Sequence, residues 1–180
     1  MNGKTSLPTV SQDSARPTDF MYAVGRLKEE HDRLNEQVKV LYTDALEAGR
    51  ETDADTALRL LGGLRERTVA FALQLEAHSE WEEREMFPLV SDYFHKRTVP
   101  SITPSFWVME KDHELALLFI GTFMELTEDN VPAARIDLIR QAASNMVQAC
   151  LILQEHFRLE EELIFPLADE MLTDIDYFYS

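Results

Sequence analysis

HSEWEEREMFPL spans residues 78–89, and HFRLEEELIFPL spans residues 156–167. The two segments align without a gap, and His, two consecutive Glu, Phe, Pro and Leu coincide in both. Such internal similarity indicates a repeated structural unit. In each segment the histidine lies four residues before the first shared glutamate, which places both on one face of an α-helix, about 6 Å apart along its axis. Each segment therefore predicts a helix that carries a His-Glu pair.

A shorter similarity lies upstream of each repeat. The segment LKEEHD around His31 resembles MEKDHE around His113, and each comes before one copy of the longer repeat. The chain is therefore predicted to contain two related helical hairpins, each with one histidine on its first helix and a His-Glu pair on its second.

Apolar residues recur at steps of three and four in four segments, which is typical of amphipathic helices. These segments cover about residues 18–49, 53–95, 103–128 and 130–172, with Thr18-Asp19, Asp53, Asp55 and Thr103 as candidate N-caps. Because short connections make sequential helices antiparallel, we expect an all-α, up-down-up-down, antiparallel four-helix bundle.

One glycine pair and two prolines could interrupt the predicted helices. Gly62-Gly63 is a candidate interruption of the second helix, and Pro88 and Pro166 each remove a backbone hydrogen bond. We expect a kink or a short final turn at each proline.

Composition restricts the class of protein. The chain has 180 residues, 45% of them apolar, which suits one domain with a real core. We expect residues 1–17, rich in Ser, Thr and Pro, to form a disordered tail before a four-helix domain at 18–180. The net charge of −16 argues against nucleic acid and anionic membranes as partners.

The cellular setting is predicted from what the sequence lacks. Cys150 is the single cysteine, so no internal disulfide can form. The N-terminal stretch has no apolar signal region, and no segment is apolar enough to cross a membrane. We therefore expect a cytoplasmic protein.

Six polar residues fall on the apolar lines of the four predicted helices: His31, His78, Glu82, His113, His156 and Glu160. Burial of unpaired carboxylates in an apolar core costs several kcal/mol each, and metal coordination is the simplest compensation. A single buried histidine is more often a core residue satisfied by one hydrogen bond, but six such residues in one bundle favour a metal site.

The donor set suggests two ions. Two cations that share both carboxylates as bridges would each receive two nitrogens and two oxygens. An oxo or hydroxo bridge would bring each metal to about five ligands and leave a position open for dioxygen, peroxide or nitric oxide. Imidazole and carboxylate ligands without thiolate suit iron or manganese, and zinc remains an alternative.

The pattern of H…HxxxE…H…HxxxE, with FPL after each HxxxE, resembles the hemerythrin-like, or HHE cation-binding, family over about residues 19–172. The resemblance implies a non-haem di-iron centre in which Glu82 and Glu160 bridge the irons and the four histidines are terminal ligands. Oxygen-carrying members have a further histidine one turn after the third-helix histidine, where this chain has Leu117. The resemblance therefore favours sensing or redox chemistry over simple oxygen carriage.

Two functions are predicted from these observations. The first is a di-iron protein that binds or reacts with dioxygen, peroxide or nitric oxide, with enzymatic turnover left open. The alternative is an iron- or oxygen-responsive regulatory module that binds a protein partner, whose identity the sequence does not indicate. A purely structural bundle with a satisfied polar core is a third, weaker hypothesis.

Several neighbouring residues have more than one interpretation. Glu85 lies on the predicted core line one turn after Glu82, so it is either an outer partner of the metal site or an exposed residue at the bundle end. Glu110 and His113 form an ExxH unit like those of ferritin-type proteins, but the second unit which that class requires is missing. Cys150 is predicted to be a packed thiol, and Glu161 and Glu162 to lie on a solvated face.

Overall fold

The computed structural model describes residues 17–94, 103–128 and 135–179, and every element in these ranges is helical. The elements are α1 (Pro17–Arg50), α2 (Ala54–Trp81), the π-helix η1 (Glu82–Met86), α3 (Phe87–Phe94), α4 (Thr103–Leu126) and α5 (Ile136–Tyr179). Because η1 and α3 continue from α2 without a loop, these three elements together form the second long helix of the predicted bundle.

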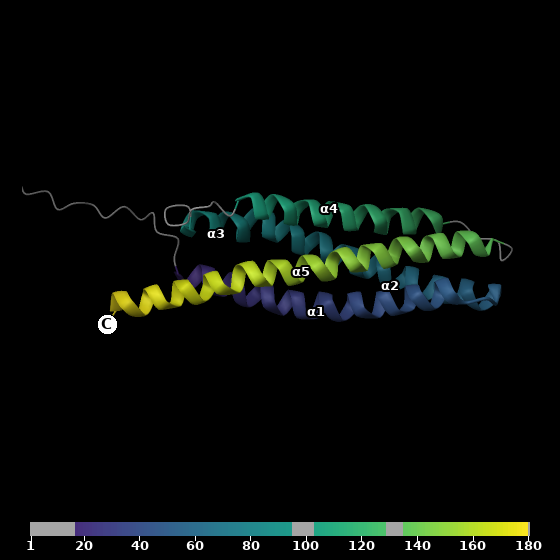
Figure 1. Ribbon diagram of the computed structural model, residues 1–180, viewed down its shortest axis with the longest axis horizontal. Coiled ribbons are helices and arrows are strands. Elements are labelled where there is room, and N and C mark those ends of the chain that lie inside the picture. Colours follow the sequence, from purple (N-terminus) through teal and green to yellow (C-terminus); the bar gives the residue numbers. More distant parts are fainter. Residues whose placement is uncertain (1–16, 95–102, 129–134, 180) are drawn as a thin grey trace, which may run out of the picture.

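The long helices lie alongside one another and alternate in direction (Figure 1). Helix α1 packs against α2 and α5, while α4 packs against α5 and α2. The prediction of an up-down-up-down four-helix bundle is confirmed. Figure 1 also shows the C-terminal part of α5 extending past the beginning of α1.

The first three long helices begin within about one residue of their predicted starts, whereas α5 begins at Ile136, about six residues after the predicted start at 130. The Asp53 side chain accepts a hydrogen bond from the backbone N–H of Thr56 at 3.0 Å, as expected of an N-cap. Helix α1 begins at Pro17, so Thr18 and Asp19 lie in its first turn instead of capping it. Proline at a first helical position is common because its missing N–H would have no partner there.

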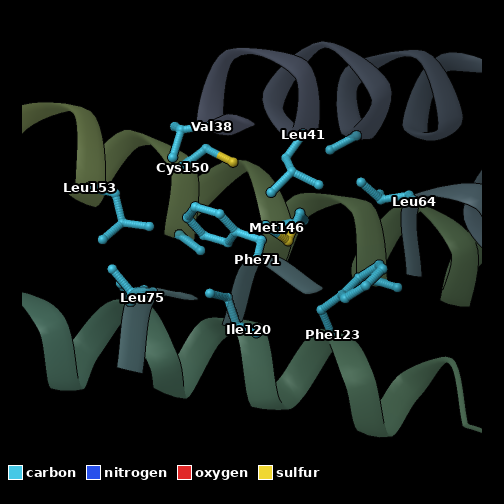
Figure 2. Packing of buried hydrophobic residues seen from close by; sticks show 14 of the residues in the cluster. Val38, Leu41, Leu64, Phe71, Leu75, Ile120, Phe123, Met146, Cys150 and Leu153 are labelled. Carbon is cyan, nitrogen blue, oxygen red and sulfur yellow. The ribbon is translucent and has the colours of Figure 1, made fainter. Parts of the chain in front are cut away.

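Two apolar clusters fill the bundle, one toward each end. The larger cluster contains residues from all four long helices, and in Figure 2 the side chains of Leu41, Phe71, Ile120 and Met146 point toward one another. The smaller cluster is built around Phe20, Leu27, Trp81, Met86, Phe87, Phe106 and Ile164. Each predicted metal ligand lies between residues of the two clusters along its own helix, so the polar residues form a layer across the bundle.

The expected break at Gly62-Gly63 is wrong, because α2 runs through both residues. Gly62 is exposed, and a Cβ at this position would meet nothing within 4 Å. The irregularity lies instead at η1, where the N–H of Phe87 bonds to the carbonyl of Glu82, five residues earlier. This widened turn comes just before Pro88, whose ring would otherwise crowd the carbonyl four residues before it.

The equivalent Pro166 has a different outcome, because α5 continues through it. In both repeats the buried face after the glutamate follows steps of four, with Met86 and Val90 in the first and Ile164 and Ala168 in the second. The predicted core position of Glu85 is therefore wrong, and its side chain is exposed. Steps of four rotate the buried face by about 40° per turn of an α-helix, which a pattern of alternating threes and fours does not anticipate.

Some predictions fall outside the described ranges. They concern the tail up to residue 16, the end of the second predicted helix at 95 and the start of the fourth at 130. Among the helices that are described, none is long and apolar enough to cross a membrane.

Candidate metal centre

The structure brings all six predicted ligands into one layer. His31 comes from α1, His78 from α2, Glu82 from the first position of η1, and His113 from α4, while α5 supplies both His156 and Glu160. None of these residues is more than 2% exposed. Every long helix therefore contributes to the layer, as the core-line positions predicted.

The glutamate oxygens lie between the imidazoles. Glu82 Oε1 is 2.8 Å from His78 Nε2 and 3.7 Å from His31 Nε2, while Glu82 Oε2 is 3.6 Å from His113 Nε2. Glu160 Oε2 is 3.3 Å from His31 Nε2 and 3.6 Å from His156 Nε2. Both carboxylates thus lie within reach of histidines from both hairpins.

The donor atoms fall into two groups that share Glu82. One group comprises His31, His78, Glu82 and Glu160, and the other comprises Glu82, His113 and His156; within each group the ligand atoms lie within 4.8 Å of one another. A carboxylate common to two such groups is consistent with a two-metal site. The buried cluster is able to bind metal.

The polar atoms of this layer test whether a metal fits. The Nε2 atoms of all four histidines and both oxygens of Glu82 and Glu160 are buried without a hydrogen-bond partner in the structure. Buried polar groups are nearly always satisfied, and an unpaired buried carboxylate is costly. Cation ligation would satisfy these atoms together, so the donor set fits a metal.

The outer ring nitrogens of the first two histidines are held by carboxylates. The Nδ1–H of His78 donates to Glu30 at 2.8 Å, and the Nδ1–H of His31 donates to Glu161 at 3.0 Å. Because a carboxylate only accepts, the proton of each neutral ring sits on Nδ1 and leaves the Nε2 lone pair facing the layer. This is the tautomer that a metal ligand requires.

The second hairpin lacks such contacts. His156 Nδ1 lies 3.9 Å from Asp112 Oδ2, which is beyond hydrogen-bond distance, and His113 Nδ1 has no hydrogen-bond partner. The Phe157 ring packs against His31, His78 and His156, with centroid distances of 4.7, 6.0 and 5.4 Å. Phe157 belongs to the larger apolar cluster and so closes the layer on that side.

In the absence of metal, His31 and His78 are protonated on both ring nitrogens at neutral pH. Burial lowers the pKa of His31, but contacts with Glu160 and Glu82 outweigh burial and raise this pKa to about 10. Burial likewise lowers the pKa of His78, but Glu82 and Glu30 raise it to about 9. The carboxylates therefore attract positive charge to this side of the layer.

The other titratable groups shift in different directions. Burial lowers the pKa of His113 to about 4, and burial followed by the charge of His113 lowers that of His156 well below its usual value. Burial raises the pKa of Glu82, but the nearby histidines outweigh burial and hold it well below the usual range. Burial and the charge of Glu82 raise the pKa of Glu160 to about 7.

Sequence reasoning missed the outer carboxylates. Glu30 and Asp112 directly precede His31 and His113 in the matching segments, so their shared acidity was a usable signal. Glu161 was assigned to a solvated face, but its contact with His31 Nδ1 corrects that assignment. A glutamate occupies this position in both copies of the longer repeat, as Glu83 and Glu161, and this was the usable signal.

The remaining candidates lie away from the layer. Glu85 is exposed and Glu110 half-buried, and neither belongs to the two donor groups. Cys150 is a buried free thiol in the larger apolar cluster, as predicted. Trp81 and Phe87 pack in the smaller apolar cluster.

Comparison with known proteins gives one match. No curated protein and no solved structure matched the chain. Residues 23–168 match the model of the hemerythrin HHE cation-binding domain, which covers most of the chain and all six residues of the polar layer. The chain therefore belongs to the hemerythrin HHE cation-binding family.

Proposed function

We propose that this chain is a di-iron protein that binds or reacts with a small ligand such as dioxygen, peroxide or nitric oxide. His31 and His78 would hold one iron, His113 and His156 the other, and Glu82 and Glu160 would bridge them. The observation that carries the proposal is the set of buried imidazole and carboxylate atoms that face one another without hydrogen-bond partners between two apolar clusters.

The choice of iron follows from the donor atoms. Four imidazoles and two carboxylates without a thiolate suit iron or manganese better than a structural zinc site. The single cysteine, Cys150, lies in the larger apolar cluster and not in either donor group. When bound, iron would supply redox chemistry and ligand affinity that no side chain of this layer has.

A small ligand is favoured by the enclosure of the layer, since none of its six residues is more than 2% exposed. A surface pocket of about 150 Å³ lies on the outer side of His78, beside Glu30 and Arg26, and is not lined by any of the other five residues of the layer. Leu117, which packs against the larger apolar cluster, stands where oxygen carriers of the family have a further histidine. This difference supports ligand sensing or turnover over reversible carriage.

Optical and Mössbauer spectra of the iron-loaded chain would test the proposal. Spectra of two coupled irons are expected, and they should change when peroxide or nitric oxide is added. Repeated additions would separate turnover from stoichiometric binding, because only an enzyme consumes many equivalents. The H78A variant should lose the response and the E85A variant should keep it. Spectra that no small ligand alters would contradict the proposal.

A regulatory module is the second candidate, and exposed apolar residues on α4 favour it. Trp107 and Leu118 are 59% and 64% exposed, on the same helix that supplies His113. In this version, metal loading would order α4 and so alter a surface that a partner contacts. Hydrogen exchange along α4 should slow when metal is added. Equal exchange with and without metal would count against this candidate.

A further inference from the structure

The two donor groups differ in the number of ligands that are already close together. The group around His31 and His78 includes both glutamates, which gives it two nitrogens and two oxygens. The group around His113 and His156 includes only Glu82, which gives it two nitrogens and one oxygen. A metal in the first position would therefore need less rearrangement of the protein.

Support for the first pair of histidines extends to the surface. Glu30, which accepts from His78 Nδ1, also accepts from Arg26 Nε at 2.7 Å, and the guanidinium of Arg26 lies 4.1 Å from the centre of the Trp81 ring. Together with the Glu161 contact to His31, these interactions hold both rings through Nδ1, the nitrogen that faces away from the polar layer. Carboxylates in this position orient a ligating imidazole and increase its basicity.

The second pair lacks this support for a reason that the repeat makes visible. Asp112 is the counterpart of Glu30, but its side chain is one methylene shorter, and it stops 3.9 Å from His156 Nδ1. Glu83 is the counterpart of Glu161, but it lies in η1 with an exposed side chain, and His113 Nδ1 has no hydrogen-bond partner. The two hairpins supply the same kinds of metal ligand, but only His31 and His78 have their Nδ1 atoms hydrogen-bonded to carboxylates.

We propose that the two metal positions are unequal, and that the His31/His78 position binds the first ion tightly while the His113/His156 position binds the second ion weakly and exchanges it. This inference rests on the proposed two-metal function. Loss of an outer partner typically weakens metal affinity by about 10- to 100-fold, so a difference of at least that size is expected between the positions. At limiting metal the protein would hold one ion, and mixed-metal forms could be made by ordered addition.

A titration of the metal-free full-length protein with Co²⁺ tests the inference. Chelator competition and the visible absorption of bound Co²⁺ should reveal two steps. The H78A variant should lose the tight step, whereas H156A should lose the weak one. Glu30→Gln and Glu161→Gln should each weaken the tight step by about 10- to 100-fold.

Asp112 provides matched controls at the counterpart position. Asp112→Asn makes the same chemical change as Glu30→Gln and should leave the tight step unchanged. Asp112→Glu restores the missing methylene and should strengthen the weak step about tenfold. Circular dichroism in chelator would verify that each variant is folded before titration.

The outcomes separate this inference from the function on which it rests. Two equivalents that bind with one affinity, or a Glu30→Gln change that weakens both steps equally, would overturn the inequality and leave the two-metal function standing. Uptake of no more than one equivalent by the unmodified protein at saturating Co²⁺, or uptake that H78A and H156A do not alter, would overturn the two-metal function itself.

Discussion

His31 Nε2 in α1 lies 3.3 Å from Glu160 Oε2 in α5, and both side chains are fully buried. This contact joins the first long helix to the last across the polar layer. In the metal-free protein it is a buried interaction between an imidazole that holds a proton and a carboxyl group. A metal ion would take the place of that proton, so the same two residues link folding, protonation and metal binding.

The stability of the metal-free protein should fall as the pH rises from about 6.5 to about 10. The pKa values of His31 and His78 in the folded chain are about 10 and 9, above their usual value of 6.5. The folded state therefore binds these protons more strongly, and the resulting stability, complete below about pH 6.5, is lost as the pH rises through 9 and 10. In the loaded protein both rings are neutral ligands, so this slope should vanish. Melting temperatures with chelator and with metal check the prediction, and parallel slopes would contradict it.

Replacement of His113 by Leu should stabilise the metal-free protein. Both ring nitrogens of His113 are buried without a hydrogen-bond partner, and an unsatisfied buried group costs about 1–3 kcal/mol. Leucine removes these groups and keeps a similar volume. Urea unfolding in chelator should show a higher midpoint for H113L than for the unmodified chain, while metal should stabilise H113L less. A lower midpoint in chelator would mean that His113 is satisfied in the folded protein.

Alanine substitutions at Glu85 and Met86, which are adjacent in η1, should differ sharply in their effect on the free energy of unfolding. Met86 is fully buried in the smaller apolar cluster, so Met86→Ala should lower the free energy of unfolding by about 2–5 kcal/mol. Glu85 is exposed, so Glu85→Ala should change this free energy by no more than about 0.5 kcal/mol. Denaturant unfolding of both variants measures the difference. The reverse order would show that Glu85 faces the core.

Much of the fold and the inner site could be predicted from the sequence, because each rests on local spacing. The His78-Glu82 pair and its repeat define a helical face, and burial of two carboxylates requires compensation whatever the details of packing. The outer partners could not be predicted in the same way. Glu161 reaches His31 across 130 positions of sequence, and only the rotation of one helix against another decides whether it faces the layer or the solvent.

The errors in helix continuity have a related cause. Glycines at Gly62-Gly63 lower helix propensity, but packing of α2 on both sides of them outweighs that local cost. The position of η1 depends on two requirements that the chain meets together: the missing N–H of Pro88, and the burial of Met86 and Val90 at steps of four after Glu82. A pattern of alternating steps of three and four describes neither. Local propensity therefore predicted an interruption at Gly62-Gly63 that is absent, whereas the irregularity expected at Pro88 is present as η1 just before it.

Replacement of Gly62 by Ala should stabilise the protein by about 0.5–1 kcal/mol, because alanine loses less backbone entropy in a helix interior. A Cβ at Gly62 would meet nothing within 4 Å. Gly49→Ala is the matched control, since its Cβ would lie 3.3 Å from the Cβ of Ala143 and should gain less. Thermal and urea unfolding of the two variants give the comparison. A destabilised G62A would indicate that α2 requires flexibility at this point.

Metal content of the protein, purified without added chelator, shows whether the buried polar layer is a two-metal site. Elemental analysis should find at least one iron equivalent per chain in the protein as purified and about two after loading with excess iron, in line with two donor groups that share Glu82. The H78A and H156A variants should each carry less, and E85A should carry the same as the unmodified chain. A chain that contains no metal and takes up none, or variants that keep the full content, would show that the six residues do not form a metal site.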